Sequence, residues 1–328
     1  MNQHKGKIIS AILAFLILNY AIAVYWSFEP KHINIKAIAT EQAALNDEQL
    51  VVGYTTTTAL IEVMNTLLEK PGGYLSNDVM PPSVLMDNIP AWEYGALEMS
   101  RDLALSMRKD LSRSQSQSTE HPMLKQAQPQ FNINSDAWAW PSAESEYRKG
   151  VNFLIGYRSD IANRSNSNAQ FYARADNLRG WLKEAEKRLG SLSQRLSASV
   201  GQDRLNTDLA GDSAARQATF APHANQIKTS WWEIDDVFYE SRGASWALLH
   251  FLQAVEYDFA DVLEKKNAKI SLQQIIRELE ATQETVWSPM ILNGSGFGIV
   301  ANHSLVMANY ISRANAALIE LTELLAQG

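Results

Sequence analysis

The amino-acid sequence predicts an all-α protein, in which an N-terminal transmembrane helix precedes a multi-helix bundle with long antiparallel helices. Apolar residues recur at helical spacing from Thr55 to Leu325, and no stretch shows a convincing strand-like alternation of apolar and polar residues. The run Ile8–Trp26 is apolar over a length that no other part of the chain matches. These two observations together indicate the fold class.

The run Ile8–Trp26 is long enough to cross a bilayer. A helix rises about 1.5 Å per residue, so about 20 apolar residues span the hydrocarbon core. The polar members of the run, Ser10 and Asn19, are uncharged. Lys5 and Lys7 precede the run, and positive charge on the short flank favours a cytoplasmic N-terminus. The lipid bilayer is therefore an expected partner through Ile8–Trp26.

A cleaved signal peptide is the alternative interpretation, because Ala21–Ala23 resembles a small-residue cleavage site. The apolar core of a signal peptide usually has only ~7–15 residues, however, and this run continues to Trp26. We therefore expect an uncleaved, single-pass anchor in a bacterial inner membrane. The expected layout is a cytoplasmic tail at 1–7, the anchor at 8–26, a juxtamembrane stalk at 27–52 and an α-helical periplasmic domain at 53–328.

The composition excludes several kinds of chemistry. The chain has 36 acidic and 29 basic side chains and no basic patch, so nucleic acid is not an expected partner. It has no cysteine, which excludes disulfides and Cys-ligated zinc. His250 and His303 lack a second histidine at helical metal spacing. We therefore expect neither a metal nor a cofactor, and the oligomeric state is left open.

The first half of the expected body contains two helices and two connecting segments. Thr55–Lys70 has one apolar face and is stopped by Pro71–Gly73. Ala91–Leu111 is again helical, and the polar run Ser112–Glu120 that follows is expected to be an exposed loop. The linker Pro129–Pro141 is rich in aromatic residues, which we expect to pack onto the helices. These residues are Phe131, Trp138 and Trp140.

The clearest periodicity lies in Ala169–Val200. Its apolar residues alternate spacings of four and three over about four heptads, which predicts a helix of about 45 Å. The expected partner is the shorter helix Ala143–Ala162, because the polar link Asn163–Asn168 is short and such links favour antiparallel neighbours.

The remaining segments are predicted from loop composition and capping residues. Gly201–Asn225 has few large apolar residues and is expected to be a long loop. Ser230 and Glu233 form a capping box that would open a helix at Trp231, with a bend or break near Gly243. A second capping box is formed by Ser271 and Gln274, and the final helix is expected at Asn302–Ala326.

An acidic cluster near the middle of the chain is the first candidate site. Asp236 and Glu240 are four residues apart and therefore share one helix face, where like charges cost stability unless a cation or proton offsets them. Such a cluster is typical of a general acid or of a metal site. The structural alternative is a solvated acidic face whose charge Arg242 partly offsets.

A glycine-rich loop before the last helix is the second candidate. Asn293, Gly294, Gly296 and Gly298 precede His303, and glycines before a helix N-terminus can bring backbone N–H groups to an anion. The spacing matches no nucleotide-binding motif, so a structural turn is the favoured interpretation. We expect this turn to pack against the body and to position the last helix, which Asn302 or Ser304 would cap.

Several longer motifs resemble a family of uncharacterised single-span proteins from proteobacterial inner membranes. The motifs are Glu69–Asp78, Ala173–Leu178, Ser288–Gly298 and Asn302–Ser304. The resemblance spans nearly the whole exported part and implies one anchor and a helical periplasmic domain, with no assigned activity and no catalytic residues.

The leading functional hypothesis is therefore a non-enzymatic scaffold or adaptor of the cell envelope that offers helical surfaces to a protein partner. The alternative is an enzyme acting on the cell wall, or a binder of a small ligand, that uses the Asp236/Glu240 cluster and the Gly294–Gly298 loop. Glu240-Ser241 resembles the catalytic glutamate–serine region of lytic transglycosylases, although the downstream signature of those enzymes is absent.

Overall fold

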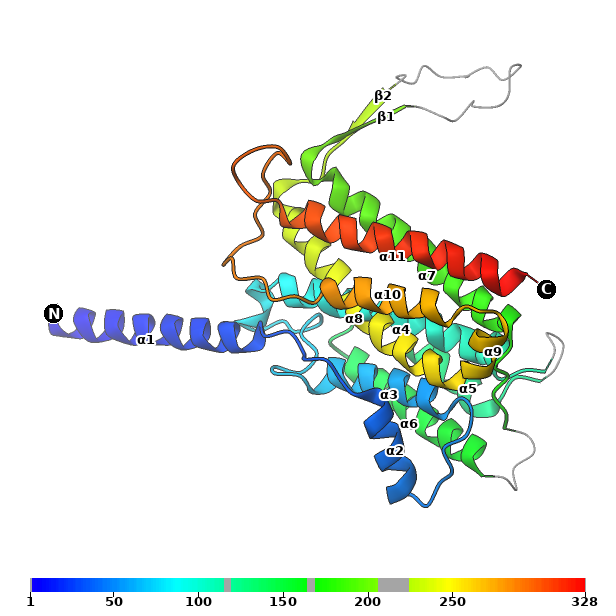
Figure 1. Ribbon diagram of the computed structural model, residues 1–328. Helices are drawn as coiled ribbons and strands as arrows, with labels where there is room; N and C mark the ends of the chain where they lie inside the picture. Colours follow the sequence, from blue (N-terminus) through cyan, green and yellow to red (C-terminus); the bar gives the residue numbers. More distant parts are fainter. Residues whose placement is uncertain (1, 115–118, 164–168, 206–223, 328) are drawn as a thin grey trace, which may run out of the picture.

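The computed structural model describes residues 2–114, 119–163, 169–205 and 224–327, and within them the architecture is all-α with one small β-ribbon (Figure 1). The α-helices are α1 (Asn2–Trp26), α2 (Ile35–Leu45), α3 (Tyr54–Glu69), α4 (Asn88–Ser106), α5 (Pro122–Phe131), α6 (Ala143–Ala162), α7 (Ala175–Ser197), α8 (Ile234–Asp258), α9 (Ala260–Lys265), α10 (Lys269–Ala281) and α11 (His303–Ala326). The ribbon consists of β1 (Gln202–Leu205) and β2 (Ala224–Ile227).

The body has three layers of helices (Figure 1). α4 and α8 pack together at its centre. α7, α10 and α11 cover one side of this pair, and α3, α5 and α6 cover the other. One continuous apolar core connects the layers, so the predicted all-α bundle is confirmed.

The two central helices touch backbone to backbone. A Cβ atom added to Gly95 on α4 would lie 2.0 Å from the carbonyl oxygen of Glu240 on α8. One added to Gly243 on α8 would lie 1.9 Å from the carbonyl oxygen of Trp92. The prediction of a bend or break at Gly243 is therefore wrong. α8 is continuous through this position, and the glycine serves the close helix approach instead.

The heptad pattern correctly predicts which face of α7 is buried, but not how long the helix is or what it packs against. α7 has 23 residues, so it is about 34 Å long rather than 45 Å. It packs along α11, whereas α6 packs against α5 and α3. The expected pairing with α6 is wrong because the periodicity defines a buried face and not its partner. The buried residues are Leu178, Trp181, Leu182, Ala185, Leu189, Leu192 and Leu196.

Two predicted helix starts also differ from the structure. Trp231–Glu233 forms a 3₁₀ turn before α8, and within the described chain the Ser230 side chain makes no capping hydrogen bond there. α10 begins at Lys269, so Ser271 lies inside the helix rather than at its cap. Asn302, in contrast, caps α11 as predicted, because its side-chain oxygen accepts a hydrogen bond from the backbone N–H of Leu305 at 2.9 Å.

Two segments that were expected to be loops contain more structure than their composition indicates. The expected linker 129–141 begins inside α5, which ends at the buried Phe131. Trp138 and Trp140 are exposed, so only one of the three aromatic residues packs as predicted. The expected loop 201–225 contributes β1 and the start of β2, which pair antiparallel with Gln202 opposite Ile227. Its central part, 206–223, lies outside the described residues.

α1 projects away from the body (Figure 1). Residues His4–Trp26 form a helix that is long and apolar enough to cross a membrane, and none of its apolar stretch is buried inside the protein. The following segment lies against the body, because the backbone N–H of Ile33 donates a hydrogen bond to His250 Nε2 at 2.9 Å. The expected stalk 27–52 thus includes α2 and makes contacts with α3 and α8.

Candidate functional site

An open, charged cleft runs between α4, α7 and α8. Its volume is about 560 Å³, and an adjoining hollow of about 510 Å³ shares Ser191 and Arg195 with it. The cleft is lined mainly by charged side chains, among them Glu98, Asp102, Arg188, Arg195 and Glu240. Asp236, Glu233 and Lys228 line the adjoining hollow. The cleft and the adjoining hollow together bring Glu240 and Asp236 of the predicted site close to basic residues of α7.

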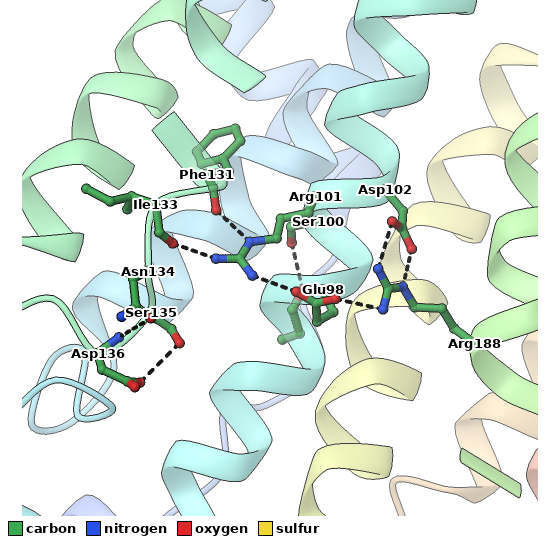
Figure 2. Close-up of polar contacts among 11 residues, drawn as sticks. Glu98, Ser100, Arg101, Asp102, Phe131, Ile133, Asn134, Ser135, Asp136 and Arg188 are labelled. Carbon is green, nitrogen blue, oxygen red and sulfur yellow. Dashed lines mark hydrogen bonds and ion pairs between the residues drawn. The ribbon is translucent and has the colours of Figure 1, made fainter. Parts of the chain in front are cut away.

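Arg188 on α7 joins two carboxylates of α4 (Figure 2). Its Nη1 lies 2.7 Å from Glu98 Oε2, and its Nη2 donates to Asp102 Oδ1 at 3.0 Å. The hydrogen bonds that Arg188 donates to Asp102, together with the negative charges of Asp102 and Glu98, raise the pKa of Arg188 further above its usual value. The guanidinium therefore stays charged and fixes the distance between α4 and α7.

Arg101 extends this network toward α5 (Figure 2). It donates to Glu98 Oε1 at 2.6 Å and to the carbonyl oxygens of Phe131 at 2.6 Å and Ile133 at 2.7 Å. The carboxylate of Glu98 thus lies between two arginines. The negative charges of Glu98 and Asp102 at this end of the cleft are therefore both neutralised by arginines of the same protein.

The acidic pair of α8 has two different environments. Glu240 accepts a charged hydrogen bond from Arg195 Nη1 at 2.6 Å. The Oδ1 atom of Asp236 is buried and has no hydrogen-bond partner among the described residues. Partial burial, followed by the charges of Asp87 and Asp235, raises the pKa of Asp236 to about 6. Asp236 is therefore the cleft carboxyl group that can exchange a proton near neutral pH.

Arg242 belongs to a different part of the molecule. Its side chain is buried and makes an ion pair with Glu29, at 2.5 Å between Nη2 and Oε2. Its Nη1 also donates to the carbonyl oxygens of Thr282 at 2.8 Å and Glu284 at 2.9 Å. Arg242 therefore connects the segment after α1 to the end of α10, and it does not offset the charges of Asp236 and Glu240.

The glycine-rich loop closes on itself at its base. Gly294 N–H donates to the carbonyl oxygen of Ala301 at 3.0 Å, and the Asn302 amide donates to the Gly294 carbonyl oxygen at 2.6 Å. Asn293 donates to the carbonyl oxygen of Ser199 at 3.0 Å, and His303 Nδ1 accepts from the Leu292 N–H at 3.0 Å. The base is thus a structural turn that positions α11, in agreement with the favoured interpretation.

The tip of this loop departs from the expected packing. Gly296 adopts a positive φ of 52°, and residues 295–300 are exposed rather than packed on the body. The side chains of Phe297 and Ile299 are fully exposed. The structure therefore keeps Asn293, Gly294, Gly296, Gly298 and His303 together at the start of α11, apart from the charged cleft.

Sequence reasoning missed a buried ion pair between Lys70 and Glu93. Lys70 Nζ lies 2.6 Å from Glu93 Oε1, and both side chains are almost fully buried. The Glu93 carboxylate also accepts hydrogen bonds from the backbone N–H groups of Leu75 and Ser76. One hint of this burial was present in the sequence: Glu93 is the residue next to Trp92, and Trp92 lies on the predicted apolar face of the helix.

Among the residues that the structure describes, no group of three or more histidine, aspartate or glutamate side chains is placed to hold a metal ion. Burial lowers the pKa of His250 to about 4, so this imidazole is neutral at pH 7 and can accept the hydrogen bond from Ile33. It therefore serves the docking of the segment after α1.

The fold and the cleft define an all-α bacterial protein with a single N-terminal apolar helix long enough to span a membrane. The chain belongs to the family described as "Uncharacterized protein conserved in bacteria (DUF2333)", whose model matches residues 2–328. The resemblance to an uncharacterised family is thereby confirmed. Neither the curated proteins nor the solved structures contain a significant match to the chain.

Proposed function

We propose that the protein is a non-enzymatic scaffold or adaptor of the bacterial cell envelope. The observation that carries this proposal is the pairing of charges in the cleft. Glu98, Asp102 and Glu240 are each bound by an arginine of the same chain. Paired carboxylates are poor acids and bases because their partner cations stabilise the ionised form. An open surface of alternating charge is suited to selective recognition of a protein partner.

The anchor and its flanking charges support a location in the inner membrane with the body in the periplasm. A helix with apolar side chains exposed all around it is stable in lipid and costly in water. Lys5 and Lys7 favour a cytoplasmic N-terminus by the positive-inside rule. The cleft would then face partners in the envelope.

The apolar face of α7 is buried inside the body, so it is not one of the helical surfaces that could bind a partner. We therefore assign recognition of the partner to the charged cleft, which is open to solvent. Arg195 is the most suitable residue for testing it, since its side chain is 45% exposed while it pairs with Glu240.

The test compares two charge reversals in the full chain, tagged and expressed at its natural level. Arg195→Glu reverses the charge in the cleft. Arg313→Glu is the matched control, because Arg313 also pairs with a glutamate and is 53% exposed, but lies on α11 outside the cleft. Partners are cross-linked in cells and captured from detergent-solubilised membranes.

The proposal expects a defined partner that is lost with Arg195→Glu and retained with Arg313→Glu, while both variants keep a normal melting temperature. Capture of the same proteins with both variants would contradict recognition through the cleft. If the unaltered chain captures no partner protein at all, the scaffold function itself is contradicted.

One observation favours the alternative function, a small-ligand binder or cell-wall-acting enzyme. Asp236 lines a hollow of about 510 Å³, and its raised pKa of about 6 suits proton transfer. On this reading Asp236→Asn folds normally, still captures the partners of the unaltered chain, and fails to replace the protein in a deletion strain. Normal complementation by Asp236→Asn removes this alternative.

A further inference from the structure

Two loops of the body consist of apolar and uncharged residues that face solvent. Loop 79–86 and loop 285–302 contain no aspartate, glutamate, lysine or arginine. Several of their large side chains are well exposed: Val79, Met80, Val84, Leu85, Trp287, Met290, Phe297, Ile299 and Val300. Exposed apolar side chains gathered in uncharged loops indicate a contact with a membrane or another protein.

Loop 79–86 follows a segment that is fixed next to the end of the anchor. A Cβ atom added to Gly72 would lie 2.8 Å from the ring of Trp26, the last residue of α1. The buried pair Lys70–Glu93 holds the same segment from the other side. The segment that leads into this loop therefore lies beside the point where α1 joins the body.

Loop 285–302 is fixed to the same point by Arg242. Its guanidinium binds Glu29, three residues after α1, and the carbonyl oxygens of Thr282 and Glu284, just before the loop. Phe28 and Val286 line one common hollow of about 730 Å³. Figure 1 shows the orange segment between α10 and α11 on the side of the body from which α1 emerges.

These contacts decide between the two possible occupants. A bilayer that contains α1 ends near Trp26. Loops that follow segments held beside the end of α1, on the same side of the body, therefore lie close to the lipid interface. Tryptophan and other large apolar side chains favour this interface, and the absence of charged groups avoids a desolvation cost there. A protein partner would have to compete with the bilayer for the same surface.

We propose that loops 79–86 and 285–302 insert into the interfacial region of the leaflet that α1 leaves, so that the body rests on the phospholipid surface. This inference rests on the membrane anchoring that forms part of the proposed function. It adds a second membrane contact, which sets the orientation of the charged cleft relative to the bilayer.

The test uses spin labels on single cysteines, which is possible because the natural chain contains none. The full chain is reconstituted into vesicles of phosphatidylethanolamine and phosphatidylglycerol. Labels are placed at Phe297→Cys and Leu85→Cys in the loops and at Leu16→Cys in the anchor. Ile270→Cys is the matched control, since Ile270 is an apolar residue with 73% exposure at the start of α10, which lies beside α9 at the end of the body opposite α1 (Figure 1).

Accessibility to oxygen, which concentrates in lipid, is compared with accessibility to a water-soluble nickel chelate. The proposal expects both loop labels to be in lipid, at a shallower depth than Leu16→Cys, with Ile270→Cys in water. If the label on either loop is in water while the label at Leu16→Cys is in lipid, loop insertion is overturned, but the membrane anchoring by α1 still holds. The exposed loop would then be a surface for a protein partner. An aqueous Leu16→Cys label overturns the anchoring and the loop insertion together.

Discussion

Gly243 on α8 lies directly against the backbone carbonyl of Trp92 on α4, and a Cβ atom there would be 1.9 Å from that oxygen. Gly95 makes the reciprocal contact with Glu240 one turn away. The two central helices can approach this closely only because both positions lack a side chain. Their separation sets the position of Glu240 at the floor of the charged cleft.

Gly243→Ala is expected to lower the stability of the fold by about 3 kcal/mol, because the added methyl group meets rigid backbone rather than a movable side chain. The melting temperature should therefore fall by several degrees. Gly180→Ala is the control: Gly180 lies in α7 with open space around it, and there alanine should stabilise the helix by ~0.5–1 kcal/mol. Similar melts for both variants would contradict the close contact.

The pairing of α7 with α11 is testable by a disulfide. Ser193 and Ser312 bring their hydroxyl oxygens within 2.5 Å of each other, so Ser193→Cys/Ser312→Cys should cross-link on mild oxidation. The product is detected by its shifted mobility without reductant. Ser193→Cys combined with Ser159→Cys on α6 should remain reduced. Cross-linking of this second pair would restore the α6–α7 pairing expected from the sequence.

The ion pair Lys70–Glu93 should be strongly coupled. Burial raises the pKa of Glu93, and the Lys70 ammonium counteracts part of that rise. Lys70→Met leaves a buried carboxylate without its cation and is expected to cost about 3–5 kcal/mol. Lys70→Met/Glu93→Gln should recover part of that loss in chemical denaturation. A double variant as unstable as the sum of the two single variants would show that the two residues act independently.

The stability should depend on pH through Asp236. Its folded-state pKa of about 6 lies above the ordinary value of 3.8, so the folded protein binds this proton more tightly than the unfolded chain. The free energy of unfolding therefore falls as pH rises from about 4 to about 6 and stays lowered above that. Asp236→Asn removes this loss and should raise the melting temperature at pH 7.5 but not near pH 4. Asp261→Asn, at an exposed position, is the control.

The orientation of the anchor is testable with a reporter enzyme that is active only in the periplasm. Fused after Gly328, the reporter should be active, because Lys5 and Lys7 favour a cytoplasmic N-terminus. N-terminal sequencing of the membrane-bound protein checks for cleavage after Ala23. A stable but inactive fusion would reverse the orientation, and a mature chain starting at Val24 would show that the segment is a signal peptide.

The sequence by itself determined the features that depend on neighbouring residues. The period of apolar residues identified the all-α class and the buried face of α7, and the length of the uninterrupted apolar run identified the helix α1. The cap at Asn302 was predictable for the same reason, because a capping side chain bonds to a backbone group only three residues away. Asp236 and Glu240 line two adjoining hollows because they are one helical turn apart.

Only the tertiary structure decided which elements meet. Periodicity shows that a helix face is buried but not against what, so the pairing of α7 with α11 and the backbone contact at Gly243 could not be derived from it. Arg242 was grouped with Glu240 because they are close in sequence, yet it binds Glu29, more than 200 residues away. Such contacts depend on how whole helices fit together in three dimensions, which no local pattern of residues contains.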